Sequence, residues 1–335
     1  GYFVTVKLSP WIKSHYGNKL NRITVPDEAR AYLITVGAEI ASAMRKKNPK
    51  KRARLPDKKR SVESIERWND EHKEYKLDII NTLELENVFL TNDKFDYVFH
   101  FAAESHVDNS ISGPKVFIES NVLGTQNMLE CFRKINNNYG RFIHISTDEV
   151  YGHLGFNDPS FTELTPIAPR SPYAASKASS DLLCMSYIET FNCNISITRC
   201  CNNYGPNQHN EKFIPTIIKS LSQGKKVPIY GEGLNVREWV HVHDHNLAVW
   251  SVATQGKNEV YNIGSGLELS NIELVDKICT IMGKDLDKNA IFVEDRLGHD
   301  FRYSINCNKI KEELLYEPLY NDFDEQLKEL VKIYG

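Results

Sequence analysis

The chain has 335 residues, of which 41% are hydrophobic and 25% are charged, so it is long enough to bury a sizeable core and to form two cooperating domains. Its 41 Lys and Arg against 44 Asp and Glu give a formal net charge of -3, which argues against nucleic acid or a membrane surface as the main partner and favours a small ligand. The sequence has no run of about 18 apolar residues and no apolar leader, so neither a membrane span nor a secretory signal is expected.

A strongly basic stretch, RKKNPKKRARLPDKKR, runs from Arg45 to Arg60. Short basic runs of this kind act as nuclear-targeting or nucleic-acid-binding patches, while the alternative is a solvated helix end followed by a loop. A nucleic-acid role would predict a salt-dependent affinity for DNA or RNA. Because the overall charge is negative and the run is local, this role ranks last among the interpretations.

Between about residues 75 and 200, apolar strand-like runs alternate with amphipathic helical stretches, which is the pattern of a parallel sheet with crossover helices. The predicted strands are 97–101, 142–146 and 195–198, and the predicted helices are 116–134 and 176–191. On the last helix, Leu182, Leu183, Met185 and Ile188 are spaced so that they share one face. The pattern predicts an α/β fold with a doubly wound, Rossmann-like parallel sheet over residues 1–200.

Beyond Pro206 the elements become shorter, because Gly231, Gly233, Gly264 and Gly266 punctuate the chain. We expect a smaller C-terminal α/β domain over residues 201–335 that binds mainly the substrate. Some exchange of strands and helices between the two domains is expected as well.

The densest group of reactive side chains follows the predicted strand 142–146. It reads S-T-D-E-V-Y-G from Ser146, and Y-A-A-S-K begins at Tyr173 near the start of a helix. Tyr173 and Lys177 are four residues apart and so share a helical face, where the ammonium can lower the pKa of the phenol and also hold a cofactor ribose. A lone Y-x-x-x-K is more often a surface pair, so the preceding strand and its Ser/Thr carry the functional interpretation.

This combination resembles the extended short-chain dehydrogenases, the family of NAD-dependent epimerases and dehydratases, and within it the dTDP-glucose 4,6-dehydratases. The resemblance implies that Thr147, Tyr173 and Lys177 are catalytic and deprotonate a sugar hydroxyl beside NAD. The acid pair Asp148 and Glu149 matches the dehydratases specifically. Loss of water across C5 and C6 needs one group that removes the C5 proton and another that protonates the departing C6 hydroxyl.

The resemblance extends from about Asp78 to Tyr334 and assigns two further sets of residues. For NAD it implies Asp57, Lys58, Asp78, Ile79, Phe101, Ala102, Ala103, Ser105, Ser120, Tyr173, Lys177 and Asn203. For the nucleotide sugar it implies Ser105, His106, Thr147, Asn202, Glu211, Lys212, Arg237, Asn271, Asp295, Arg296, His299, Arg302 and Tyr303. An acid at Asp57 would bond the ribose 2′-hydroxyl and repel a 2′-phosphate, which favours NAD over NADP.

Residues 1–56 match the family poorly. The family's first strand ends in a glycine-rich turn, because glycine allows backbone amides to approach the pyrophosphate at a helix N-terminus. Two degraded candidates exist, one after Val4-Thr5 and one after Ile34-Thr35, and only the second retains a glycine, Gly37. Either this part of the sequence has diverged, or cofactor binding has been lost. We favour divergence because all five predicted catalytic residues remain.

The expected reaction is the NAD-dependent dehydration of dTDP-glucose to dTDP-4-keto-6-deoxyglucose, with hydride passing from C4 to NAD and back to C6. The alternatives are a UDP-sugar 4-epimerase or decarboxylase, and a non-catalytic nucleotide-binding protein on the same fold. Epimerisation does not need removal of the C5 proton, so the acid pair argues against it. The residues alone do not distinguish thymine from uracil.

The resemblance also implies a homodimer formed through the helices at 116–134 and 176–191. Seven cysteines are present without a C-x-x-C pair, and the adjacent Cys200 and Cys201 would form only a strained bridge. We therefore expect reduced thiols and a cytoplasmic protein, and no metal site is indicated.

Overall fold

The computed structural model describes residues 75–295 and 298–335, together with the two strands at residues 4–7 and 31–35. The chain divides into two compact units. Unit 1 comprises Gly1–Ser146, Ala175–Thr198 and Val249–Val260, and unit 2 comprises Thr147–Ala174, Arg199–Ala248 and Tyr261–Gly335. The binding roles predicted for an N-terminal and a C-terminal domain stay predictions.

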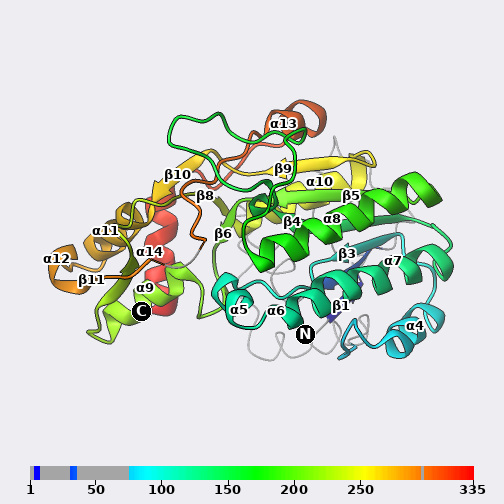
Figure 1. Ribbon diagram of the computed structural model, residues 1–335, viewed down its shortest axis with the longest axis horizontal. Helices are drawn as coiled ribbons and strands as arrows, with labels where there is room; N and C mark the ends of the chain where they lie inside the picture. The colour runs from blue at the N-terminus through cyan, green and yellow to red at the C-terminus, as the bar shows by residue number, and fades with distance from the viewer. Residues whose placement is uncertain (1–3, 8–30, 36–74, 296–297) are drawn as a thin grey trace, which may run out of the picture. The chain divides into compact units, whose positions relative to one another are not determined.

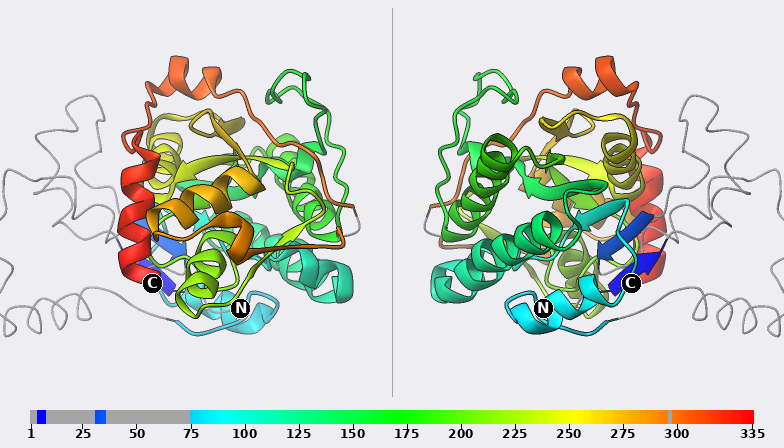
Figure 2. Two further views of the ribbon diagram at one scale, coloured as in Figure 1. Left: turned by 90° about the vertical axis from the view of Figure 1, so that its left-hand side faces the viewer. Right: turned by 90° about the vertical axis from the view of Figure 1, so that its right-hand side faces the viewer.

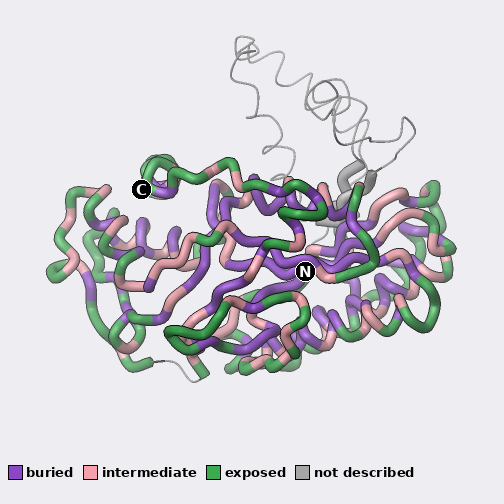
Figure 3. Tube along the Cα trace, turned by 90° about the horizontal axis from the view of Figure 1, so that it is seen from above, coloured by how far each residue is buried: buried purple, intermediate pink, exposed green. Residues whose placement is uncertain are grey.

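A six-stranded sheet has the order β1-β2-β3-β4-β5-β9 (Figure 1). Its strands are β1 (Val4–Lys7), β2 (Ala31–Thr35), β3 (Tyr97–His100), β4 (Arg141–Thr147), β5 (Ile195–Cys200) and β9 (Val260–Ile263). Its first five strands lie wholly or mostly in unit 1, and β9 lies mostly in unit 2. The pairs β2–β3 and β3–β4 are parallel, whereas β1 is antiparallel to β2. Strands β4 and β5 are buried along almost their whole length, as expected for central strands covered on both faces (Figure 3). The predicted doubly wound α/β fold is confirmed.

In the part of unit 1 that the structure describes, the helices are α4 (Thr82–Leu90), α5 (Val107–Ser112), α6 (Pro114–Phe117), the π-helical turn η2 (Ile118–Leu123), α7 (Gly124–Lys134), most of α8 (Pro172–Phe191) and the end of α10 (Val242–Gln255). The single helix expected at 116–134 is therefore interrupted by a π turn. Helix α8 begins four residues earlier than expected, because Pro172 takes the first helical position, where its fixed φ and missing N–H cost nothing.

The buried side of α8 combines apolar residues such as Ala174, Cys184 and Tyr187 with several polar ones. Ser176, Lys177, Ser180 and Asp181 are all buried, whereas the side chain of Leu182 is 55% exposed. Of the apolar residues expected to share a face of this helix, Leu183, Met185 and Ile188 pack against the core of unit 1, and only Leu182 does not. Polar burial of this kind is tolerated only where partners satisfy the groups.

Unit 2 contains two smaller sheets. The first has the order β10-β8-β6, with β6 (Asn202–Tyr204), β8 (Val236–His241) and β10 (Leu267–Ser270), and the second pairs β7 (Val227–Tyr230) with β11 (Ala290–Val293). Its helices are η3 (Asp148–Tyr151), α9 (Phe213–Ser222), the start of α10, α11 (Asn271–Ile281), α12 (Leu286–Asn289), α13 (Asn308–Leu314) and α14 (Phe323–Tyr334). Helices α9, α11 and α14 enclose a core that includes Ile217, Leu274 and Leu327 (Figure 2).

All seven cysteines lie in the described part of the chain, where they are buried and form no disulfide bond. Among the described helices, none combines the length and the apolar character that crossing a membrane requires.

Candidate active site

The loop after β4 is fixed by its own hydrogen bonds. The Thr147 hydroxyl accepts the backbone N–H of Glu149 at 3.3 Å and so caps the short helix η3. Gly152 then reverses the chain with φ 96°, and a Cβ there would lie 2.6 Å from the carbonyl oxygen of Ala168. Only glycine fits this turn, which explains the G of S-T-D-E-V-Y-G.

Three side chains contact Tyr151, the last residue of η3. The Tyr151 hydroxyl donates to Asn262 Oδ1 at 2.8 Å, the Tyr151 ring stacks on Phe161, and the Arg199 guanidinium lies 4.7 Å from the centre of the Tyr151 ring. Sequence reasoning missed Asn262, because a single Asn in an apolar strand gives no signal of its partner 111 positions earlier.

Asp148 occupies the most restrictive environment in the loop. It is 1% exposed, and its Oδ1 accepts the Thr147 hydroxyl at 3.2 Å. Its Oδ2 is buried without a hydrogen-bond partner among the described residues. Burial raises the pKa of Asp148 well above its ordinary value, and the charges of Glu149 and Glu238 add to this effect. Asp148 therefore retains its proton and can act as an acid.

Tyr173 lies within hydrogen-bonding reach of the Thr147 hydroxyl. We expected Lys177 to lower the pKa of this phenol. In the structure the pKa of Tyr173 is instead raised well above its ordinary value, first by burial and then by the charge of Glu149. The raised pKa keeps the proton on the phenol, so Tyr173 acts as a base only with a positive charge beside it.

Lys177 lies one helical turn beyond Tyr173 on α8 and is 3% exposed. Its Nζ donates to the carbonyl oxygen of Ile145 at 2.6 Å, which anchors the ammonium to β4 just before the catalytic loop. This contact fixes the position of a long side chain that would otherwise sample many rotamers.

Glu149 has a basic neighbour in Lys212, at the N-terminal end of α9. Burial lowers the pKa of Lys212, while the charges of Glu149 and Glu211 oppose that change. Lys212 can thus stabilise the ionised form of Glu149. The two acids of the loop consequently differ, since Asp148 is buried as an acid and Glu149 faces a cation.

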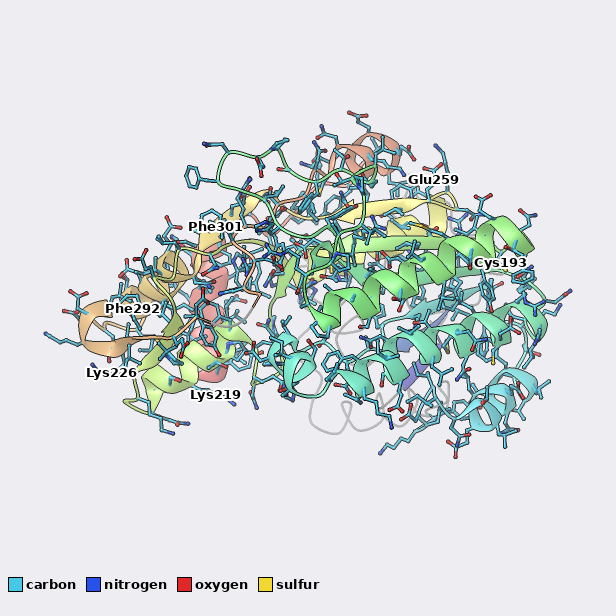
Figure 4. All side chains as sticks on the ribbon, in the orientation of Figure 1. Cys193, Lys219, Lys226, Glu259, Phe292 and Phe301 are labelled. Atoms are coloured by element: carbon cyan, nitrogen blue, oxygen red, sulfur yellow. The ribbon has the colours of Figure 1, made fainter. Side chains whose placement is uncertain are left out.

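The predicted nucleotide-binding residues of unit 2 gather around β8. Arg237 donates from Nη1 to the carbonyl oxygen of Val236 at 2.8 Å and from Nη2 to that of Asp300 at 3.0 Å, and its guanidinium lies 4.4 Å from the ring centre of Tyr303. A longer bond of 3.5 Å reaches the carbonyl oxygen of Phe301, which Figure 4 labels.

Other predicted contacts lie on neighbouring elements of unit 2. Asn271 is the first residue of α11, and Asn202 and Asn203 form β6, which pairs with β8. His299 Nδ1 lies 2.6 Å from Asp295 Oδ1. Arg302 is engaged by Glu268 through Nε at 2.6 Å and Nη2 at 2.9 Å.

The predicted NAD contacts in unit 1 include the segment after β3. Phe101, Ala102 and Ala103 directly follow this strand, and Ala103 is exposed, so no large side chain hinders the approach of a ligand. Asp78 is exposed, and its carboxylate accepts the N–H of Ile80 at 3.0 Å.

Four more of the predicted unit 1 contacts have different surroundings. Ile79 packs into the core, Ser120 lies in η2, Ser105 is exposed, and His106 caps α5 with its Nδ1 buried and unpartnered within the described residues. Asp57, Lys58, Arg296 and the basic run Arg45 to Arg60 lie outside the described residues.

The sheet order distinguishes between the two candidates for the first strand of the fold. Strand β2 ends at Thr35 and is parallel to β3, whereas β1 is antiparallel to β2. A phosphate-binding turn of an α/β fold follows a strand of the parallel sheet. The topology thus favours the turn after Ile34-Thr35, and this turn itself lies outside the described residues.

A residue that sequence reasoning missed is Glu238, which is fully buried on β8. Its Oε1 accepts the N–H of Gly266 at 2.8 Å and its Oε2 that of Ile305 at 2.9 Å. Gly264 leaves room for it, because a Cβ there would lie 2.1 Å from Oε1. The only sequence signal would have been an acid within an apolar strand.

Comparison with known proteins places the chain among nucleotide-sugar enzymes. Residues 30–330 match the family model described as GDP-mannose 4,6 dehydratase. Over 240 residues the chain is 48% identical to a dTDP-glucose 4,6-dehydratase of Streptomyces antibioticus, which is 71% of this chain and 70% of that protein. It is likewise 48% identical to a low-salt glycan biosynthesis protein of Haloferax volcanii, over 71% of this chain and 75% of that protein. A solved dTDP-glucose 4,6-dehydratase from Streptomyces venezuelae with NAD bound has a TM-score of 0.73 and 46% identity, covering 77% of this chain and 78% of that one.

Proposed function

We propose that this chain, which belongs to the GDP-mannose 4,6 dehydratase family, converts dTDP-glucose to dTDP-4-keto-6-deoxyglucose. The observation that carries the proposal is the burial of Asp148 directly beside Glu149, with its Oδ2 lacking a hydrogen-bond partner among the described residues, because burial raises the pKa of this carboxyl and elimination of water needs an acid and a base side by side. The identity to a curated dTDP-glucose 4,6-dehydratase and to a solved dTDP-glucose 4,6-dehydratase with NAD bound supports the choice of substrate and cofactor.

In this proposal the proton steps belong to four residues of the catalytic loop and of α8. Tyr173 Oη, hydrogen-bonded to Thr147, takes the proton of the C4 hydroxyl. Glu149 removes the C5 proton, which the C4 carbonyl has made acidic, and Asp148 protonates the departing C6 hydroxyl, which leaves as water. When hydride adds to C6, Glu149 returns a proton to C5. When bound, NAD supplies the hydride acceptor at C4 and its reduced form the donor at C6, and its positive ring favours the ionised phenol.

The described residues fit such a cofactor. Small alanines follow β3, and the buried ammonium of Lys177 lies at the end of β4, where a ribose hydroxyl can be held. In unit 2, Asn203 Oδ1 is buried without a hydrogen-bond partner within the described residues, so a polar ligand group there would satisfy it. The remaining cofactor and sugar contacts named from the sequence are part of the same proposal.

The test is turnover of dTDP-glucose that carries deuterium at C4, with NAD added to the purified protein. We expect a product lighter by one water, with the deuterium at C6 and, in heavy water, solvent deuterium at C5. An epimer of unchanged mass would establish the 4-epimerase alternative instead. If the protein neither turns over dTDP-glucose nor takes up NAD, the result would favour the alternative of a non-catalytic nucleotide-binding protein.

We further propose that the protein acts in the cytoplasm as a homodimer. The seven buried cysteines, which form no disulfide bond, suit a reducing compartment. Exposed apolar side chains on η2 and α8, Leu123 at 43% and Leu182 at 55%, suit a contact with a second copy. Light scattering would give twice the 38.4 kDa chain mass, and Leu182→Glu should shift the protein toward monomer.

A further inference from the structure

The buried side of α8 carries two opposite charges one helical turn apart. Lys177 is 3% exposed and Asp181 is 0% exposed. Residues four apart on a helix share a face, so both charges lie on the side that is buried. A buried charge is strongly unfavourable unless an opposite charge or hydrogen bonds compensate it.

Asp181 also faces a histidine of the neighbouring strand. His144 of β4 is 0% exposed, and its Nε2 lies 3.5 Å from Asp181 Oδ1. The His144 ring packs at 5.4 Å against the ring of His100 from β3, whose Nε2 is 2.8 Å from Thr125 Oγ1 of α7. A continuous series of polar groups thus runs from α8 through two strands to α7.

Lys177 reaches the same strand one residue further along. Its Nζ donates to the carbonyl oxygen of Ile145, which directly follows His144. Asp181 and Lys177 therefore both lie against β4, at two adjacent residues of that strand. The carboxylate and the ammonium thus share one buried layer.

We propose that Asp181, oriented by His144, is the positioning residue that keeps the Lys177 ammonium charged and directed at the end of β4. The catalytic pattern of Thr147, Asp148, Glu149, Tyr173 and Lys177 assigns no role to Asp181 or to His144. The inference rests on the proposed function only where it concerns turnover, in which a charged Lys177 is proposed to help the Tyr173 phenol ionise together with the cofactor.

The charge states of the other titratable groups that face this layer are consistent with a single negative charge in it. Burial lowers the pKa of His100 well below its ordinary value, with smaller contributions from His144 and Lys177, so His100 is neutral. Burial raises the pKa of Cys184 well above its ordinary value, and the charge of Asp181 adds to this while that of Lys177 opposes it. Both groups are uncharged near neutral pH, which leaves Asp181 as the anion for Lys177.

The first test needs no activity. Unfolding in denaturant is measured for the wild type, Lys177→Met, Asp181→Asn and the double variant. We expect each single variant to lose stability, because it leaves one buried charge, and the double variant to be more stable than the sum of the two losses predicts. Additive losses would overturn the proposal. If Asp181→Asn alone does not fold but the double variant does, the proposal is supported.

The second test is the pH dependence of kcat. Without the anion, Lys177 loses its proton at lower pH, so Asp181→Asn should lower kcat about tenfold at neutral pH and move the basic limb of the profile to lower pH. KM should stay within about twofold, and His144→Gln should shift the limb in the same direction by less.

Cys184→Ser is the matched control, because Cys184 is equally buried on the same face of α8 and is uncharged. Its profile should superimpose on that of the wild type. A loss of kcat in Asp181→Asn without any change in the profile's shape would show a purely structural role and overturn the proposal. If the wild type itself does not turn over dTDP-glucose, the proposed function fails, while the unfolding measurements still decide this inference.

Discussion

Two buried polar regions of this molecule are built on opposite principles. Beneath α8 in unit 1, polar side chains meet one another, as Asn121 Nδ2 does when it donates to Ser176 Oγ at 2.8 Å and Ser180 Oγ when it donates to the carbonyl oxygen of Asn121 at 2.6 Å. In the catalytic loop of unit 2, Asp148 Oδ2 has no such partner among the described residues. Satisfied groups make a rigid support, whereas an unsatisfied acid holds a proton ready for a substrate.

The largest effect should come from removing that acid. Asp148→Asn keeps the shape of the side chain but cannot donate a carboxyl proton, so kcat for dehydration should fall by about 10²–10⁴. The kcat of Tyr173→Phe should fall by a similar factor, because this variant blocks the earlier removal of the C4 hydroxyl proton. Measured with C4-deuterated dTDP-glucose, Asp148→Asn should accumulate the 4-keto sugar that still carries its C6 hydroxyl, and Tyr173→Phe should not.

The exposed loop acid Asp158 supplies the control. Its Oδ2 accepts the N–H of Gly155, and Asp158→Asn should leave kcat within about twofold. Equal loss in Asp148→Asn and Asp158→Asn would show that the contrast between the two regions does not bear on catalysis.

The fold was predictable where local pattern decides it. The strands expected at 97–101, 142–146 and 195–198 are β3, β4 and β5, because buried parallel strands are continuous apolar runs. The π turn η2 was not predictable, since one extra residue in a helical turn leaves composition and periodicity almost unchanged. The buried polar residues of α8 were missed for a related reason, as their partners lie on other elements.

In the candidate site, too, some features could be predicted from the sequence and others could not. Tyr173, Lys177 and the Thr147-Asp148-Glu149 run stand out because their spacing along the chain is itself informative. The raised pKa of Tyr173 could not be read from that spacing, because burial and the charge of Glu149 outweigh what the Tyr–Lys spacing suggests. Such effects depend on which distant residues surround the phenol.

The Glu238 carboxylate in unit 2 accepts two hydrogen bonds, so we expect it to contribute to stability as the hydrogen-bonded side chains beneath α8 in unit 1 do. Glu238→Gln turns one acceptor into a donor that faces an N–H, so the free energy of unfolding should fall by about 1–3 kcal/mol. Urea unfolding measures this change. Gly264→Ala should destabilise the protein as well, because its Cβ collides with the Glu238 carboxylate.

The same Glu238→Gln variant should alter the pH profile. Asp148 must be protonated to act, so activity falls as pH rises through its raised pKa. The Glu238 charge contributes to raising the pKa of Asp148, so its removal should move the basic limb of kcat to lower pH. An unchanged limb would mean that burial and Glu149 alone set the proton of Asp148.

The smallest effect should come from Arg302, although the sequence resemblance places it among the sugar-nucleotide contacts. Three of its nitrogens are engaged, two by Glu268 and one by the carbonyl oxygen of Asp158 at 2.8 Å. Arg237 donates to the carbonyl oxygens of Val236 and Asp300, and a guanidinium at this position can hold diphosphate oxygens bidentately. Arg237→Gln should therefore raise KM about tenfold or more, whereas Arg302→Gln should leave KM within about twofold and cost at most about 1 kcal/mol of stability. Equal increases in KM in the two variants would mean that substrate binding releases Arg302 from Glu268. The Arg302–Glu268 ion pair would then belong to the substrate-binding site and would not be a purely structural contact.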